Sequence, residues 1–215
     1  MNKKLKVFLL ILISILILFF LIQFVYKSIQ TGNNISKSSN DLIEDILNIS
    51  SYEAELEVTV NSNKTTNKYI LHQYYIAPNL SKQIVKEPSN LEGLEIIYDG
   101  NKLEIKNTNL GLSKIYENYT YLNGNILWLN FFIENCNINK YKTEETENEI
   151  ILNSKINKYN GNLYINKKTN LPTKIEILDN SNQSKIYIEY KEIKLNNIHQ
   201  DNILAYVTKD INIEV

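Results

Sequence analysis

The stretch Tyr52–Val60, YEAELEVTV, decides the fold of this chain. Apolar residues fill every second position, and three glutamates and a threonine stand between them. Successive side chains of a strand point to opposite faces, so this period of two indicates a β-strand with one buried face. The expected assignment is buried Ala54, Leu56 and Val58 and exposed Glu53, Glu55 and Glu57.

Similar strand patterns continue along the chain. Asn61–Asn63 supplies a turn, and Lys68–Ile76 returns as the second strand. Leu94–Lys106 predicts a hairpin, because Asp99-Gly100 between two β-branched runs provides the positive φ of a tight turn. Further predicted strands are Ser81–Lys86, Glu149–Asn153, Asn162–Asn166, Thr173–Asp179 and Lys185–Lys191.

Two segments show helical spacing instead. Residues 42–49 carry apolar side chains at helical intervals after Asn40 or Asp41, either of which can cap a helix. The apolar residues of Leu122–Ile133 also suit a helix, flanked by Asn123 and Asn135. The sequence therefore predicts an all-β meander of about eight to ten strands with two helices.

The N-terminal segment Val7–Val25 consists of apolar residues interrupted only by Ser14 and Gln23. At 1.5 Å per residue it would span roughly 28 Å, close to the thickness of the hydrocarbon core of a bilayer. A cleavable signal peptide is the main alternative, but its apolar region is shorter and ends in a small-x-small site. No such site follows here, so we predict a transmembrane anchor that includes Val7, Leu12, Leu18 and Val25.

Charge sets the expected orientation of that anchor. Three lysines precede it and only Lys27 follows closely, which favours a cytoplasmic N-terminus. The predicted organisation is a cytoplasmic tail (1–6), a transmembrane anchor (7–25), a Gly-, Asn- and Ser-rich linker (26–40) and an extracytoplasmic β domain (41–215).

Composition argues against several classes of function. The net charge is −1 and the chain has no arginine, so the basic face that nucleic-acid binding needs is not expected. His72 and His199 show no metal-ligand spacing, and no two glycines pair as a phosphate-binding motif. The single cysteine, Cys136, reads as a buried inert thiol rather than a nucleophile. We therefore expect a protein that is not an enzyme and needs no cofactor or metal.

Aromatic residues are the feature that points to binding. The chain has 15 tyrosines, and four aromatic residues cluster around one break between strand and helix. Tyr and Trp are enriched in protein interfaces, and they also fill half-buried sheet faces. Two interpretations stay open: the rings form a partner surface, or they fill the core under the second helix. The residues of this predicted surface are Tyr116, Tyr119, Tyr121 and Trp128.

The order of these motifs resembles the LolA-like lipoprotein-carrier superfamily. The resemblance rests on the hairpin YDGNKLEI (Tyr98–Ile105) and on LPTKIEILDNSNQSKIYIEYKEIKLN (Leu171–Asn196), and it covers about Asp41 to the C-terminus. It implies a curved antiparallel sheet, or incomplete β-barrel, with two helices packed on one side over an apolar cavity.

Within that superfamily the chain is most similar to the clostridial germination lipoproteins. NKTTNKYILHQYY (Asn63–Tyr75) and LSKIYENYTYL (Leu112–Leu122) carry this resemblance. It implies a partner that binds and activates a spore-cortex N-acetylmuramoyl-L-alanine amidase, located in the cell envelope or the spore intermembrane space. The chain departs from those proteins because no lipobox cysteine follows its apolar segment. The alternative implied by the superfamily is a carrier of a lipid or other apolar ligand.

We predict that the N-terminal apolar segment is retained in the mature protein, because no cleavage site follows it. Intact-mass measurement of the chain from the membrane fraction should give the uncleaved mass. A mature N-terminus near Ser28 would contradict the prediction.

Overall fold

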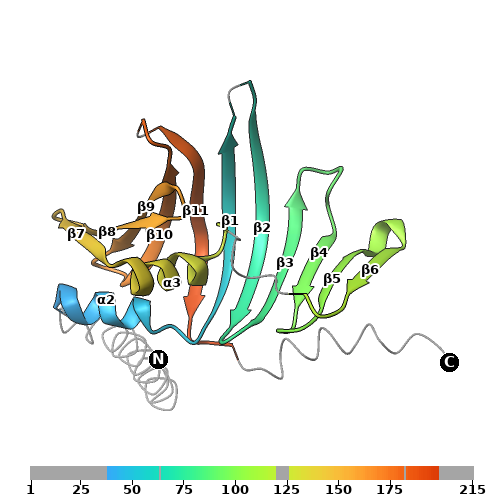
Figure 1. Ribbon diagram of the computed structural model, residues 1–215, viewed down its shortest axis with the longest axis horizontal. Coiled ribbons are helices and arrows are strands. Elements are labelled where there is room, and N and C mark those ends of the chain that lie inside the picture. Colours follow the sequence, from blue (N-terminus) through green and yellow to red (C-terminus); the bar gives the residue numbers. More distant parts are fainter. Residues whose placement is uncertain (1–37, 63, 120–125, 182, 199–215) are drawn as a thin grey trace, which may run out of the picture. The chain divides into compact units, whose positions relative to one another are not determined.

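The computed structural model describes residues 38–62, 64–119, 126–181 and 183–198 (Figure 1). Within these ranges the chain forms two α-helices, α2 (Ser39–Leu47) and α3 (Leu129–Asn139), and the 3-10 turn η1 (Thr108–Leu110). The strands are β1 (Ser51–Asn61), β2 (Thr66–Ile76), β3 (Leu80–Glu87), β4 (Leu94–Tyr98), β5 (Leu103–Asn107), β6 (Leu112–Tyr116), β7 (Tyr141–Glu145), β8 (Glu149–Ile156), β9 (Tyr159–Asn166), β10 (Leu171–Leu178) and β11 (Ser184–Leu195).

The described residues include no helix that is long and apolar enough to cross a membrane. The predicted anchor at 7–25 and the predicted linker up to residue 37 lie outside the described residues. The anchor therefore stays a prediction.

All the strands form one curved antiparallel sheet in the order β6-β5-β4-β3-β2-β1-β11-β10-β9-β8-β7 (Figure 1). Two meanders, β1–β6 and β7–β11, join where β1 pairs with β11. Tyr52 of β1 lies opposite Tyr75 of β2 on one side and Leu195 of β11 on the other. The predicted mainly β fold is confirmed, with more strands than the sequence patterns indicated.

β1 has the predicted faces. Ala54, Leu56 and Val58 are at most 1% exposed and define what we call the core face of the sheet. Of the three glutamates that were predicted to be exposed, Glu55 is exposed, whereas Glu53 and Glu57 are half-buried. The Glu57 carboxylate lies 3.2 Å from Lys68 Nζ and 3.7 Å from Lys191 Nζ, and the hydrogen bond from Lys68 lowers its pKa. On the outer face of β1, Glu57 is therefore paired with a lysine of each neighbouring strand.

The predicted hairpin is also present, as β4 and β5. The Asp99 carboxylate accepts hydrogen bonds from the backbone N–H groups of Asn101 (2.9 Å) and Lys102 (2.7 Å). Gly100 takes a φ of 99°, in the left-handed region that favours glycine. This local geometry closes the turn that the Asp-Gly pair predicted.

α3 covers one half of the core face. It packs with β8 and the neighbouring strands of the second meander (Figure 1). At Gly161 of β9 an added Cβ would lie 2.4 Å from Ile156 Cδ1 and 2.9 Å from Phe132 Cε2, so helix and sheet approach closely there. α2 places Leu42, Ile43 and Ile46 in the same apolar core.

The second helix does not have its predicted boundaries. Leu122–Ile133 was expected to be helical, but α3 begins at Leu129, after an extended Trp128, and continues to Asn139. Ile126 and Leu127 form a turn before the helix and pack against the core. Their apolar side chains are therefore explained by contact with the core and not by a helical conformation. Residues 122–125 lie outside the described residues.

The sequence patterns missed the two outermost strands. Neither β6 nor β7 was among the predicted strands. Both strands are exposed along their whole length. A strand without a buried face shows no alternation of apolar and polar residues, which explains why period alone did not find them.

Leu56→Ala should lower the free energy of unfolding by about 2–5 kcal/mol, because the leucine is fully buried at the centre of the sheet. Urea unfolding of the full-length chain measures this. Glu55→Ala on the exposed face is the matched control and should change stability by about 0.5 kcal/mol or less. Equal effects of the two substitutions would contradict the assignment of the faces.

Candidate partner-binding surface

The last strand at one end of the sheet forms the candidate surface. In the part of the chain that the structure describes, β6 pairs with β5 on one side and with no strand on the other, and all of its residues are exposed. The turn η1 connects the two strands. Asn107 caps this turn by accepting a hydrogen bond from the Leu110 backbone N–H at 3.2 Å. Gly111 follows with a φ of 62°, which reverses the chain into β6.

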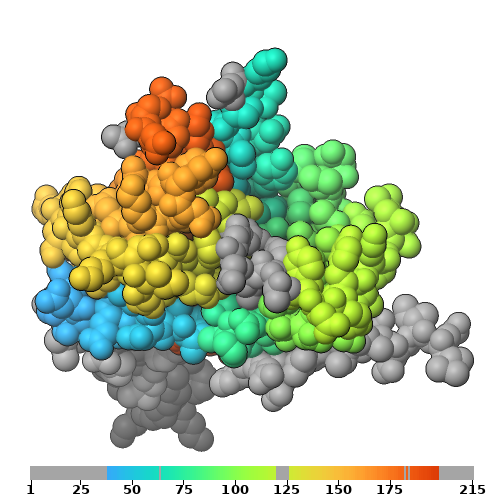
Figure 2. Space-filling model, viewed as in Figure 1, coloured from blue at the N-terminus to red at the C-terminus, as the bar shows by residue number. Residues whose placement is uncertain are grey.

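Apolar side chains gather on this strand and its turns. Of the seven exposed large apolar side chains in the part of the chain that the structure describes, five lie between residues 110 and 119. Contiguous exposed apolar area marks interaction sites, whereas scattered single residues are ordinary. We call this set the β6 surface (right-hand side of Figure 2, yellow-green): Leu110, Leu112, Ile115, Tyr116 and Tyr119, which are 37–65% exposed.

An open groove of about 430 Å³ lies next to the β6 surface. The register places Leu94, Asn107 and Leu112 side by side on the core face of β4, β5 and β6, and all three line the groove. The other apolar lining residues are Leu91, Ile105 and Leu110. Its volume falls within the range of about 300–1,000 Å³ that small-ligand sites occupy.

The charged residues that line the groove are two lysines, Lys106 and Lys114. Lys114 lies on the core face of β6, and its Nζ is 5.0 Å from the centroid of the Tyr116 ring. The acidic residues of β4 and β5, Glu95 and Glu104, alternate onto the outer face. In the described strands β4–β6 the core face therefore carries one ammonium group and no carboxylate.

The structure separates the predicted aromatic residues. Tyr116 and Tyr119 are 37% and 39% exposed, with ring centroids 6.1 Å apart, and both belong to the β6 surface. Trp128 is 1% exposed and packs with its ring centroid 6.5 Å from that of Tyr52. Tyr121 lies outside the described residues. Trp128 thus lies in the core, as the alternative interpretation expected. A partner surface formed by Tyr116 and Tyr119 stays a prediction.

Sequence analysis did not single out Leu110, Leu112 or Ile115. The run Leu-Ser-Lys-Ile-Tyr (Leu112–Tyr116) was a usable signal, because it ends in two residues of high β-propensity, Ile115 and Tyr116, and carries one charge. Following Asn-Leu-Gly, it could have been predicted as a strand after a tight turn.

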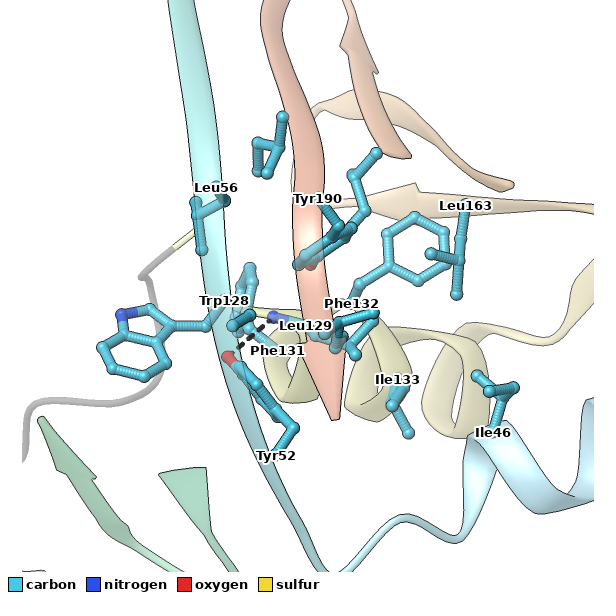
Figure 3. Close-up of a cluster of buried hydrophobic side chains, with 14 of the residues drawn as sticks. Ile46, Tyr52, Leu56, Trp128, Leu129, Phe131, Phe132, Ile133, Leu163 and Tyr190 are labelled. Carbon is cyan, nitrogen blue, oxygen red and sulfur yellow. Dashed lines mark hydrogen bonds between the residues drawn. The ribbon is translucent and has the colours of Figure 1, made fainter. Parts of the chain in front are cut away.

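Polar contacts at the start of α3 hold the helix on the sheet. The Tyr52 hydroxyl accepts a hydrogen bond from the Leu129 backbone N–H at 3.3 Å (Figure 3). It donates one to Gln73 Oε1 at 3.2 Å. Gln73 Nε2 donates in turn to Gln83 Oε1 at 2.9 Å. Burial raises the pKa of Tyr52 well above its ordinary value, so the hydroxyl keeps its proton. This buried network joins β1, β2 and β3 to the helix.

The described residues offer little catalytic chemistry. Burial raises the pKa of the Cys136 thiol to about 11, and the side chain is 1% exposed, so its reactive thiolate is scarce at neutral pH. His72 Nε2 lies 3.1 Å from Glu53 Oε1, and its ring stacks on Tyr74 on the outer face. Within the described ranges no three His, Cys, Asp or Glu side chains gather as metal ligands.

Solved structures place this fold in a class. An uncharacterized conserved protein from Thermus thermophilus matches with a TM-score of 0.51 at 12% identity, over 78% of this chain and 93% of that chain. The LolA superfamily protein NE2245 from Nitrosomonas europaea matches with a TM-score of 0.39 at 15% identity, over 78% and 97%. The Thermus thermophilus match shows a shared fold, and the curved open sheet with two helices agrees with the architecture that the LolA-like resemblance implied.

The model of the family described as "Sporulation protein YdcC-like" matches residues 6–204, and the chain therefore belongs to that family. A chain in the structure of the CwlD amidase from Clostridioides difficile in complex with the GerS lipoprotein matches at 28% identity with a TM-score of 0.46, over 73% of this chain and 95% of that chain. The GerS lipoprotein named in that structure is the kind of protein that the sequence resemblance indicated. No protein among those of curated function matches the sequence.

Trp128→Ala should lower the free energy of unfolding by about 3–5 kcal/mol, because it empties a large volume in the core. Tyr116→Ala should change it by about 0.5 kcal/mol or less, because that ring lies on the surface. Urea unfolding of the two full-length variants makes the comparison. A large loss for Tyr116→Ala would show that its ring is a core element.

Proposed function

We propose that this chain is a membrane-anchored, non-catalytic binding protein of the bacterial cell envelope. Its partner is a spore-cortex N-acetylmuramoyl-L-alanine amidase, which it binds and activates for spore germination. The observation that carries the proposal is the β6 surface, an exposed apolar strand at the end of a domain with little catalytic chemistry in its described residues.

Relatives support a role in binding a protein. The family is one of sporulation proteins, and the 28% identical structure contains an amidase bound to the lipoprotein GerS. Tyr is enriched where proteins bind one another, and two of the five residues of the β6 surface are tyrosines. A partner that covers these rings would remove their apolar area from water, which is the main favourable contribution to association.

Location is part of the same proposal. The apolar segment 7–25 would hold the chain in the membrane with its N-terminus in the cytoplasm, and the β domain would then face the envelope. An anchor of this kind would take the place of the lipid of a lipoprotein. The domain would meet its amidase outside the membrane.

The test combines binding and activity. The full-length chain, purified in mild detergent, is mixed with an N-acetylmuramoyl-L-alanine amidase of the same organism, and release of peptide from purified peptidoglycan is followed. We expect a stable complex and faster release with both proteins than with the amidase alone, and no release by this chain alone. A mixture that forms no complex and leaves the amidase rate unchanged would overturn the proposal.

The groove favours a second candidate, the binding of a lipid or other apolar ligand. Its apolar lining and volume of about 430 Å³ suit an acyl chain, whereas the half of the core face under α3 is filled by side chains such as Phe132 and Leu163. Mass spectrometry of organic extracts from the purified chain tests this candidate. Recovery of one lipid class in an amount matching the protein would support a carrier.

A further inference from the structure

The free edge of β6 has a shape and chemistry that differ from those of the other sheet edge. In an antiparallel pair, alternate residues turn both backbone N–H and C=O toward the neighbouring strand, and the residues between turn theirs away. Among the described strands β6 pairs with β5 alone, and every residue of β6 is exposed. Its outward backbone groups thus form a row of donors and acceptors that an added strand can bind.

The opposite edge, β7, is protected by charge. Its sequence is Tyr-Lys-Thr-Glu-Glu, with Glu144 bonded to Asn153 at 3.0 Å and Glu145 paired with Lys167 at 2.9 Å. Charged side chains on an edge strand discourage pairing with another chain. β6 is equally long but carries a single charge, Lys114, among apolar residues. Only one of the two edges is therefore suited to receive a strand.

The side chains of β6 define what that strand must look like. Leu112, Lys114 and Tyr116 point to the core face, where Leu112 adjoins the groove. A strand added next to β6 would place alternate side chains beside these three. Apolar residues would meet Leu112 and Tyr116, and an acidic residue would meet Lys114, because the core face of β4–β6 has no carboxylate of its own.

A second copy of this chain fits the edge poorly. Antiparallel pairing of two β6 strands about their common centre would set Leu112 opposite Tyr116 and Lys114 opposite the other Lys114. Like charges directly opposite each other on one face of a sheet are destabilising. This centred pairing of two copies is therefore disfavoured, and the charge of Lys114 favours a strand of a different protein that carries an acidic residue.

We infer that β6 binds an extended segment of its protein partner by strand addition, and that this segment carries an apolar–x–acidic–x–apolar pattern read by Leu112, Lys114 and Tyr116. This deepens the proposed function and rests on it, because the segment would belong to the amidase. Backbone hydrogen bonds to the β6 edge would supply affinity, and Lys114 would select the acidic residue.

Two synthetic peptides test the edge without the amidase. One is Thr-Val-Thr-Glu-Thr-Val-Thr, blocked at both ends, and the other has Lys in place of Glu. Backbone hydrogen exchange of the full-length chain is measured with each peptide at about 1 mM, a concentration that detects weak binding. We expect the Glu peptide to slow exchange in Leu112–Tyr116 by about tenfold, and to leave Tyr141–Glu145 unchanged.

Charge reversal supplies the specificity control. Lys114→Glu should reverse the preference of the chain for the two peptides, so that the Lys peptide protects β6 and the Glu peptide does not. Lys142→Glu makes the same change on the β7 edge and should leave the wild-type preference intact. Absence of protection by either peptide, or a preference unaffected by Lys114→Glu, overturns the inference.

The amidase itself separates this inference from the proposed function. Slowed exchange in β6 on binding the amidase, together with weaker binding by Lys114→Glu, supports both. A complex that forms with β6 exchange unchanged overturns strand addition and leaves the proposed function standing. Protection by the Glu peptide without any complex with the amidase supports the edge site and overturns the amidase as partner.

Discussion

The first turn of α3 lies inside the protein, where its backbone N–H groups have to find partners. Trp128, at the cap position, makes no side-chain hydrogen bond to the helix, and the Tyr52 hydroxyl binds the Leu129 N–H instead. Gln73 orients that hydroxyl from the next strand. This contact fixes where the helix begins on the sheet, so it also decides which half of the core face α3 covers and which half is left to the groove.

That division gives the two halves of the sheet different roles. In the second meander, α3 fills the core face with side chains, and the result is a solid apolar core. In the first meander, β4–β6 lie beyond the helix, and their core face lines an open groove. Apolar side chains such as Leu94, Ile105 and Leu112 line that groove, and they lie at the end of the sheet where β6 is the last of the described strands.

A strand could be predicted from the sequence where one of its faces is buried and the other is exposed. β1 alternates because Leu56 is buried and Glu55 is not, and the Asp99-Gly100 turn follows from local geometry. β6 and β7 are exposed on both faces, so nothing in their period marks them as strands. Aromatic clustering drew attention to Tyr116 and Tyr119, but it could not separate them from Trp128, because the depth of a ring depends on strands distant in sequence.

The pairing of β1 with β11 has a consequence for how the chain folds. The strands of each meander pair with neighbours in sequence, so each ladder can form soon after its residues are made. β1 is different, because its second partner is β11, the last strand of the sheet in sequence. Tyr52 can pair with Leu195 only after β11 has been made. Contacts of such sequence separation slow folding, since a long loop must close before they form. Until then the central strand of the finished sheet is an unpaired edge, and its row of glutamates opposes aggregation while synthesis is completed.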